Sequence, residues 1–233
     1  MSAAPGSRAA EKRAAAERAV ALVADGMVVG LGSGSTAECA IEALAARMKG
    51  GLRCVGIPSS ERSAALAERL GIPLAGFADH PVIDLTLDGA DEVELASRGL
   101  VKGLGGALLR EKILAAASRA LVIMVDDTKL VGRLGERAPI PVEVVPFGWE
   151  ATARRLEGLG AQVARRLGPG GAPFVSDGGH AILDCRFGPL ADPAATARAL
   201  DLMVGVVEHG LFLEFAPSLV IASGEGVRLI GPG

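Results

Sequence analysis

Short apolar runs alternate with helical patterns through the first half of the chain, and this alternation constrains the fold more than any other feature. The predicted strands are residues 27–31, 52–57, 82–87 and 120–125. The predicted helices between them are residues 35–48, 60–70 and 105–118. Such repeats are typical of an α/β fold, a Rossmann-like parallel sheet with helices on both faces. In these sheets ligands bind beyond the carboxyl ends of the strands.

The pattern changes at three closely spaced prolines, Pro139, Pro141 and Pro146, which favour a connection over a helix. Beyond them the sequence predicts a strand at 142–145, a helix at 149–159, a hairpin of strands 174–176 and 181–185, and a helix at 193–203 with Asp192 as N-cap residue. This order of elements indicates a smaller α+β domain, ferredoxin-like in topology.

These patterns predict two domains. The larger, Rossmann-like domain is expected to contain residues 1–138 and 208–233, with tail strands at 210–215 and 219–230 that return to it. The small α+β domain is expected to contain residues 139–207.

Composition excludes several classes of function. The 233 residues carry a formal net charge of −3, with no Tyr and a single Trp, so the chain offers neither the basic surface nor the aromatic rings used to bind nucleic acid. No long uncharged apolar run could span a membrane. The three cysteines, Cys39, Cys54 and Cys185, show neither a disulfide framework nor zinc spacing, which indicates a reducing cytoplasm.

The N-terminus is rich in Ala, but charged residues from Glu11 to Arg18 interrupt it. A secretory signal needs a continuous apolar core, so this segment does not fit one. We expect a few disordered residues followed by an amphipathic helix that ends near Val23.

A first glycine-rich turn, residues 30–36 (GLGSGST), lies between the first predicted strand and helix. Glycines let the backbone turn tightly and expose its N–H groups, while the helix N-terminus and the hydroxyls add positive potential and donors. The segment therefore predicts a phosphate-binding site, although it is neither a P-loop nor a full dinucleotide fingerprint. The alternative is a tight strand–helix turn with Ser35 as N-cap residue.

Two aspartates, Asp88 and Asp91, follow the predicted strand at 82–87. They could bind a metal, transfer protons or hold sugar hydroxyls, and the alternative is ordinary turn chemistry, which favours Asp and Gly. The histidines show no recognisable ligand spacing, so we expect no metal.

Lys102 begins a second glycine-rich turn, residues 102–106, and Glu111 lies on the helix predicted after it. At helical spacing, Glu111 shares its face only with small or apolar side chains, those of Ala107, Leu108, Leu114 and Ala115. Burial on such a face would raise the pKa of the carboxyl, which suits a general base. The alternatives are a buried structural ion pair for Glu111 and a solvated loop lysine for Lys102.

The chain closely resembles the type A ribose-5-phosphate isomerases in collinear segments that span nearly its whole length. These segments are GLGSGSTA (30–37), IPSSERS (57–63), DLTLDGADEV (84–93), KGLGGALLREKI (102–113), DDTK (126–129), PIPVEVVP (139–146) and SDGGHAILDC (176–185). The first, third and fourth are highly specific in combination, although none would be alone.

The resemblance implies roles for individual residues. Glu111 would be the catalytic base, Lys102 would stabilise an enediolate, Asp88 would assist ring opening and proton movement, and Asp91 would orient hydroxyls. The residues implied to bind substrate are Ser33, Gly34, Ser35, Thr36, Lys12 and Lys129 at the phosphate, and Gly89, Ala90, Gly103, Leu104 and Gly105 elsewhere.

The implied reaction interconverts D-ribose 5-phosphate and D-ribulose 5-phosphate, a step of the non-oxidative branch of the pentose phosphate pathway, without a cofactor. A homodimer or homotetramer is also implied. Two alternatives are a non-catalytic sugar-phosphate sensor and an amino-sugar phosphate deaminase. A sensor has no need of Lys102 and Glu111, and the deaminase chemistry commonly uses a histidine, which the key segment lacks.

The chain departs from the family at Leu104, where the family usually has the second of three glycines. Either the leucine side chain presses on the pocket, or the backbone avoids a positive φ at this position. Gly106, where the family usually has alanine, offers additional backbone freedom.

Overall fold

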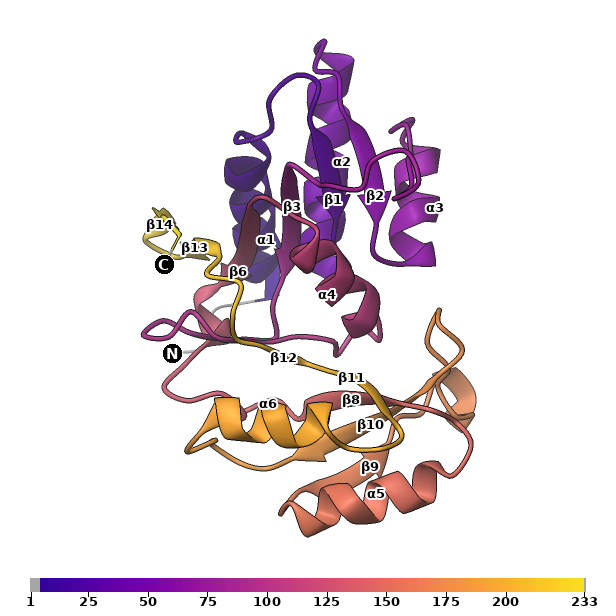
Figure 1. Ribbon diagram of the computed structural model, residues 1–233. Helices are drawn as coiled ribbons and strands as arrows, with labels where there is room; N and C mark the ends of the chain where they lie inside the picture. The colour runs from indigo at the N-terminus through magenta and orange to yellow at the C-terminus, as the bar shows by residue number, and fades with distance from the viewer. Residues whose placement is uncertain (1–4, 233) are drawn as a thin grey trace. The chain divides into compact units, whose positions relative to one another are not determined.

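In the computed structural model, which describes residues 5–232, the strands of this alternating pattern form a six-stranded sheet (Figure 1). Its strands, in spatial order, are β14 (Gly226–Ile230), β13 (Ser218–Ser223), β6 (Leu121–Asp126), β3 (Leu85–Gly89), β1 (Val28–Leu31) and β2 (Val55–Pro58). Neighbouring strands are parallel except β13 and β14, which form an antiparallel hairpin. Strands β1 and β6 are buried throughout, as expected for strands covered on both faces.

Helices cover both faces of this sheet. They are α1 (Pro5–Val20), α2 (Ser35–Lys49), α3 (Glu61–Arg69) and α4 (Leu108–Ala116). Val29 and Leu31 share a core with residues of α1, α2 and α3. Val28 points to the opposite face, where it packs with Leu114 of α4. The predicted Rossmann-like α/β architecture is therefore confirmed.

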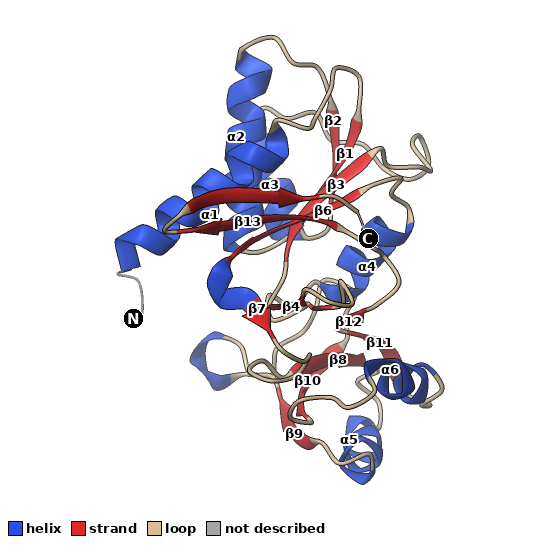
Figure 2. Ribbon diagram, turned by 90° about the vertical axis from the view of Figure 1, so that its left-hand side faces the viewer, coloured by secondary structure: helices blue, strands red, loops and turns tan. Residues whose placement is uncertain are grey.

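A separate core is built on a four-stranded antiparallel sheet (Figure 2). Its elements, in chain order, are β8 (Ile140–Val144), α5 (Trp149–Gly158), β9 (Gln162–Arg165), β10 (Ala181–Arg186), α6 (Pro193–Asp201) and β11 (Val206–His209). The spatial order β11-β8-β10-β9 fits a ferredoxin-like β-α-β-β-α-β unit, as predicted. The expected strand at 174–176 is wrong, because β10 pairs with β9 and residue 175 forms only an isolated bridge. Asp192 caps α6 by accepting a hydrogen bond from the Ala195 N–H, which also agrees with the prediction.

Short strands form a third sheet, which the sequence pattern did not indicate. They are β12 (Leu211–Phe212), β5 (Leu100–Val101), β4 (Glu92–Glu94) and β7 (Leu130–Val131), and the chain also has 3-10 turns at η1 (Asp127–Lys129) and η2 (Pro169–Gly171). Strands of two or three residues carry too little periodicity to be predicted. The tail strands β13 and β14 join the six-stranded sheet as expected, and β12 pairs with β5 in the third sheet.

The chain divides into two units. The first unit comprises Met1–Ala90, Arg110–Lys129 and Phe215–Gly233, and the second comprises Asp91–Leu109 and Leu130–Glu214. Compared with the predicted domains, the second unit takes in residues 91–109, 130–138 and 208–214 as well. The predicted N-terminal helix ends at Val20, and the residues before Pro5, expected to be disordered, lie outside the described part of the chain. None of the described helices is both long and apolar enough to cross a lipid bilayer.

Candidate active site

The first glycine-rich turn connects β1 to α2 in the first unit. Gly34 is the N-cap residue of α2, with a φ of 91° and no side-chain cap, so the alternative of Ser35 as N-cap is wrong. The Ser35 hydroxyl instead accepts a 2.9 Å hydrogen bond from the Lys12 ammonium on α1. A lysine cation and an uncapped helix N-terminus therefore meet at this turn, an arrangement that suits an anion.

Buried serine hydroxyls at the start of α3 support this turn. The Ser33 hydroxyl donates to Ser60 (2.8 Å), which donates to Ser63 (2.9 Å). Ser63 in turn donates to the Gly32 carbonyl (2.7 Å), and Ser59 contacts the Ser33 hydroxyl at 2.8 Å. Local sequence assigns these serines no function, and their clustering where a strand meets a helix is the one available signal.

Asp88, near the end of β3, ties the first turn to the sheet. Its buried carboxylate accepts hydrogen bonds from the N–H groups of Ser33 (3.2 Å) and Gly89 (2.8 Å). Gly32 lies so close that a Cβ there would overlap the carboxylate and stand 2.7 Å from the Asp88 Cα. The close approach of the two backbones therefore requires glycine at position 32. Both hydrogen-bond donors of Ser33 are engaged within the protein. Its backbone N–H donates to Asp88, and its hydroxyl donates to Ser60.

Other predicted residues of the first unit lie on the same sheet or on its helices. Glu111 is buried on the α4 face that also carries Leu114 and Ala115, as its helical spacing predicts. Lys129 ends the 3-10 turn η1, directly after β6. The first turn, Asp88 and Lys129 thus lie at the carboxyl ends of three adjacent parallel strands, β1, β3 and β6. This is the edge at which such sheets bind ligands.

The second glycine-rich turn belongs to the second unit and begins at Lys102. Lys102 is buried, and its N–H donates to the Gly210 carbonyl at 2.9 Å. Its ammonium lies 5.6 Å from the centre of the Phe212 ring, within cation–π range. The alternative of a solvated loop lysine is therefore wrong.

Leu104 occupies its position in the second turn without backbone strain. Positive φ angles in this turn fall on Gly103 (102°) and Gly106 (86°), and the backbone avoids them at Leu104. The Leu104 side chain is 42% exposed. Its N–H donates to the Asp91 carboxylate at 2.9 Å, so this amide is already engaged by a predicted catalytic residue.

Arg166, just after β9, binds carbonyl groups of the same turn. Its Nη1 donates to the Gly103 carbonyl (2.8 Å) and to the Leu104 carbonyl (3.0 Å). Its Nε donates to the Asp184 carboxylate at 3.0 Å, and its Nη2 donates to the second oxygen of that carboxylate. Local sequence gives no signal for Arg166, because it lies 62 residues beyond Leu104.

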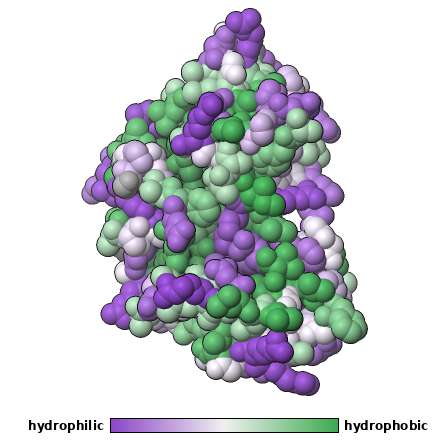
Figure 3. Space-filling view, in the orientation of Figure 1, coloured by the Kyte–Doolittle hydropathy of each residue, from purple (hydrophilic) through white to green (hydrophobic). Residues whose placement is uncertain are grey.

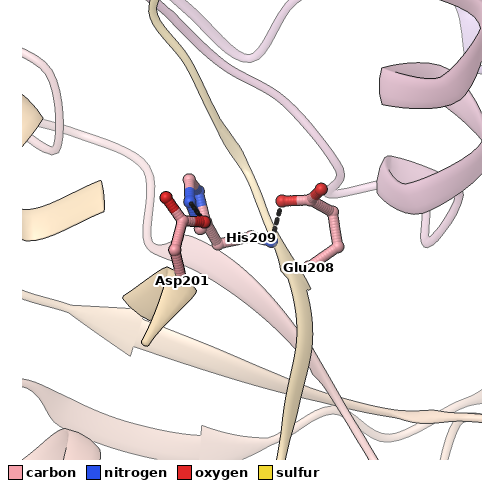
Figure 4. Close-up of side chains that lie close together, drawn as sticks. All are labelled: Asp201, Glu208 and His209. Carbon is pink, nitrogen blue, oxygen red and sulfur yellow. Dashed lines mark hydrogen bonds and ion pairs between the residues drawn. The ribbon is translucent and has the colours of Figure 1, made fainter. Parts of the chain in front are cut away.

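One group of possible metal ligands occurs among the described residues, Asp201, Glu208 and His209 in the second unit (Figure 4). Nδ1 of His209 accepts a hydrogen bond from the Leu211 N–H (3.2 Å), so Nε2 carries the ring proton and donates it to Asp201 (3.0 Å). Glu208 accepts a hydrogen bond from the His209 N–H (2.7 Å). Because both ring nitrogens are engaged, the group fastens the end of β11 to α6 and is not a preformed metal site.

The fold and the first glycine-rich turn are typical of one class of protein, the α/β proteins that bind small phosphorylated molecules. A family model described as ribose 5-phosphate isomerase A (phosphoriboisomerase A) matches residues 55–226. The chain belongs to the ribose 5-phosphate isomerase A family.

Relatives and solved structures support this membership over nearly the whole chain. Ribose-5-phosphate isomerase A of Gloeobacter violaceus is 58% identical over 221 residues, covering 95% of this chain and 96% of that protein. The protein of the same name from Thermomicrobium roseum is 54% identical and covers 94% and 92%. The structure of ribose 5-phosphate isomerase A from Methanocaldococcus jannaschii matches with a TM-score of 0.91 at 37% identity, covering 95% and 98%. These matches do not favour a sensor domain or a deaminase.

Proposed function

We propose that this protein interconverts D-ribose 5-phosphate and D-ribulose 5-phosphate through a cis-enediolate. The observation that carries the proposal is the buried Glu111 carboxylate on an apolar helix face, in a unit that also holds a glycine-rich turn suited to an anion. Proton transfer beside a carbonyl requires such a base, and a bound phosphate holds the reacting carbons in place. Membership of the ribose 5-phosphate isomerase A family supports the same reaction.

Glu111 is the proposed base. It removes the proton from C2 of the open-chain aldose, the electron pair of that bond forms the C1–C2 double bond, and the carbonyl electrons move to O1. Protonated Glu111 then returns the proton to C1. Asp88 assists ring opening and carries a proton from O2 to O1, so the ketose has the same atoms as the aldose. No metal or organic cofactor takes part in these steps.

The phosphate is proposed to bind at the first glycine-rich turn. Its proposed ligands are Gly34, Ser35, Thr36, Lys12 and Lys129. Ser33 forms part of the turn, and it would donate to the phosphate only by giving up its bond to Ser60 or to Asp88. Binding energy from this remote group positions the reacting carbons.

Groups of the second unit are proposed to act on the substrate oxygens. Lys102 supplies positive charge to the enediolate, and the turn from Gly103 to Gly105 supplies backbone donors fixed in place before the charge develops. Asp91 orients hydroxyls and also holds the Leu104 amide. Gly89 and Ala90 are proposed to contact the sugar through their backbone.

A solved ligand complex supports an enediolate. A D-ribose-5-phosphate isomerase that is 34% identical to this chain, with a TM-score of 0.91, was solved in complex with phospho-erythronic acid. The carboxylate of that acid places two oxygens on a planar carbon. It therefore resembles the planar, oxygen-bearing carbons of an enediolate next to a phosphate-bearing chain.

Glu111→Gln tests the proposed base. The amide keeps the size of the side chain but cannot accept the proton, so we expect turnover to fall by about 100- to 10,000-fold while KM changes little. Conversion of ribose 5-phosphate to ribulose 5-phosphate measures both constants. Glu68→Gln, the same change at an exposed position of α3, should leave both unchanged. Turnover close to wild type in Glu111→Gln would show that another group is the base.

We also propose that the protein is a cytoplasmic homodimer or homotetramer that acts in the non-oxidative branch of the pentose phosphate pathway. Apolar side chains gather on the face of the second unit that Figure 3 presents to the viewer. The most exposed large apolar side chains are Phe147 (96%), Leu202 (85%) and Val204 (77%), all in this unit. Exposed apolar surface of this kind favours self-association, which light scattering on the purified protein would measure.

A further inference from the structure

All three nitrogens of the Arg166 guanidinium bind either the second glycine-rich turn or Asp184. Its Nη1 binds the carbonyls of Gly103 and Leu104, while Nε and Nη2 bind the two oxygens of Asp184. The Arg166 side chain is only 10% exposed. Bidentate pairing of this kind fixes both the position and the plane of a guanidinium. Arg166 is therefore a rigid, positively charged support for two consecutive peptide groups.

The two peptide groups differ in how their N–H sides are used. The Gly103–Leu104 peptide is held at both ends, its carbonyl by Arg166 and its N–H by Asp91. The Leu104–Gly105 peptide is held by Arg166 at its carbonyl only. Its N–H, on Gly105, has no hydrogen-bond partner among residues 5–232. In a trans peptide the N–H points away from the carbonyl, so the Gly105 donor points away from the guanidinium.

We propose that Arg166, oriented by Asp184, is a positioning residue that aims and polarises the Gly105 amide toward a negatively charged oxygen of the substrate. The inference rests on the proposed isomerase function, because that reaction creates such an oxygen. A cation bound to the peptide carbonyl draws electron density away from the N–H, which strengthens it as a donor. The donor is then fixed before the charge develops, which is the condition for lowering a barrier electrostatically.

Phe174 adds a second support to the turn, next to Arg166. Its ring lies 6.0 Å from the Arg166 guanidinium, and a Cβ added to Gly106 would overlap that ring. Its N–H donates to the Arg166 carbonyl at 3.0 Å, which places it beside Arg166. An apolar ring here limits the access of water to the guanidinium, and this strengthens its hydrogen bonds to the turn.

Arg165 provides a matched control. It is the last residue of β9 and precedes Arg166 directly, but its guanidinium stacks on Trp149, 4.7 Å from the ring centre. Changing Arg165 to Met thus removes the same charge from a neighbouring position without touching the turn. A general effect of charge or of β9 stability would appear in both variants, while an effect on the turn appears only at Arg166.

The experiment compares Arg166→Met and Arg165→Met in the ribose 5-phosphate assay, with circular dichroism to establish folding. We expect Arg166→Met to lower kcat by about tenfold or more, less than the loss of a whole oxyanion donor, with KM nearly unchanged. Millimolar guanidinium should restore part of the kcat of Arg166→Met in a saturable way and should not affect Arg165→Met. A merely structural role for Arg166 predicts neither the kcat–KM split nor the rescue.

Arg166→Lys keeps a cation and the aliphatic stem, and it serves if Arg166→Met does not fold. An ammonium cannot bind both carbonyls and the carboxylate with the same geometry, so kcat should again fall while KM holds. A folded Arg166 variant with wild-type kcat overturns the inference, and so does failure of both variants to fold, since Arg166 would then serve the fold alone. Failure of the proposed function is distinct, because wild type and Arg165→Met would then also lack activity.

Discussion

The two glycine-rich turns present backbone amides in similar ways but are held by different forces. The first turn, residues 30–36, rests on neutral serine hydroxyls and on the Asp88 carboxylate, which accepts a backbone N–H, and the Lys12 ammonium donates to the Ser35 hydroxyl at its end. The second turn, residues 102–106, is held by charged side chains, with Asp91 at an N–H and Arg166 at two carbonyls. The difference lies in the support and not in the glycines.

This difference follows from the charge that each turn is proposed to meet. A phosphate is already charged when it binds, so neutral hydroxyls can hold the first turn without repelling it. The enediolate charge exists only during the reaction, so the second turn must be rigid beforehand, and charge-assisted hydrogen bonds provide that rigidity. Substitutions that remove supports of the first turn are therefore expected to change mainly KM. Substitutions that remove supports of the second turn are expected to change mainly kcat.

Among changes to the two turns, the largest expected effect comes from Gly32→Ala, which breaks the comparison because Gly32 contacts the carboxylate that supports the first turn. A Cβ at this position would overlap the Asp88 carboxylate and stand 2.7 Å from its Cα. Asp88 must move, and it is both a support and a proposed catalytic group. We expect kcat/KM to fall by about 100-fold or more and the free energy of unfolding to fall by about 1–3 kcal/mol.

Steady-state kinetics and urea denaturation measure the two effects of Gly32→Ala. The control is Gly76→Ala in the same unit, where the added Cβ meets no atom within 4 Å. Near-normal activity in Gly32→Ala would mean that the reaction requires neither the observed position of Asp88 nor its hydrogen bond to Ser33.

Ser63→Ala is expected to have an intermediate effect, and it sharpens the comparison. The Ser63 hydroxyl donates to the Gly32 carbonyl at 2.7 Å and accepts from Ser60 at 2.9 Å, so its loss leaves buried partners unsatisfied. We expect a destabilisation of about 1–2 kcal/mol and a rise of several-fold in KM, with kcat within about twofold. Ser223→Ala, at the β13–β14 hairpin of the same unit, is the control. A fall in kcat without a change in KM would contradict the division of roles between the turns.

The sequence predicted the parts of the site that local patterns encode. The six-stranded sheet follows from apolar runs at strand spacing, and the place of Glu111 on a buried face follows from helical spacing. Glycines after a strand predicted both turns. Each of these features depends on neighbours within a few residues of one another.

The supports of the turns could not be predicted in this way. Ser63 reaches Gly32 across 31 positions, and Arg166 reaches Gly103 across 63. Such contacts depend on how separate elements pack, which periodicity does not describe. Leu104 shows the same limit. The sequence raised a question about backbone strain there, and the answer depends on the φ angles of Gly103 and Gly106.

Leu104→Gly is expected to have the smallest effect, because it changes a side chain that supports neither turn. The Leu104 side chain is 42% exposed, and its contribution to the turn comes from its N–H and carbonyl, which glycine retains. The added backbone freedom should cost about 0.5–1 kcal/mol of folding stability and leave kcat within about twofold. Leu159→Gly, a leucine with the same 42% exposure outside the turn, controls for the loss of apolar surface. A tenfold change in kcat for Leu104→Gly, without the same change for Leu159→Gly, would show that the leucine side chain takes part in the reaction. The charged supports would then not be sufficient to explain how the second turn contributes to kcat.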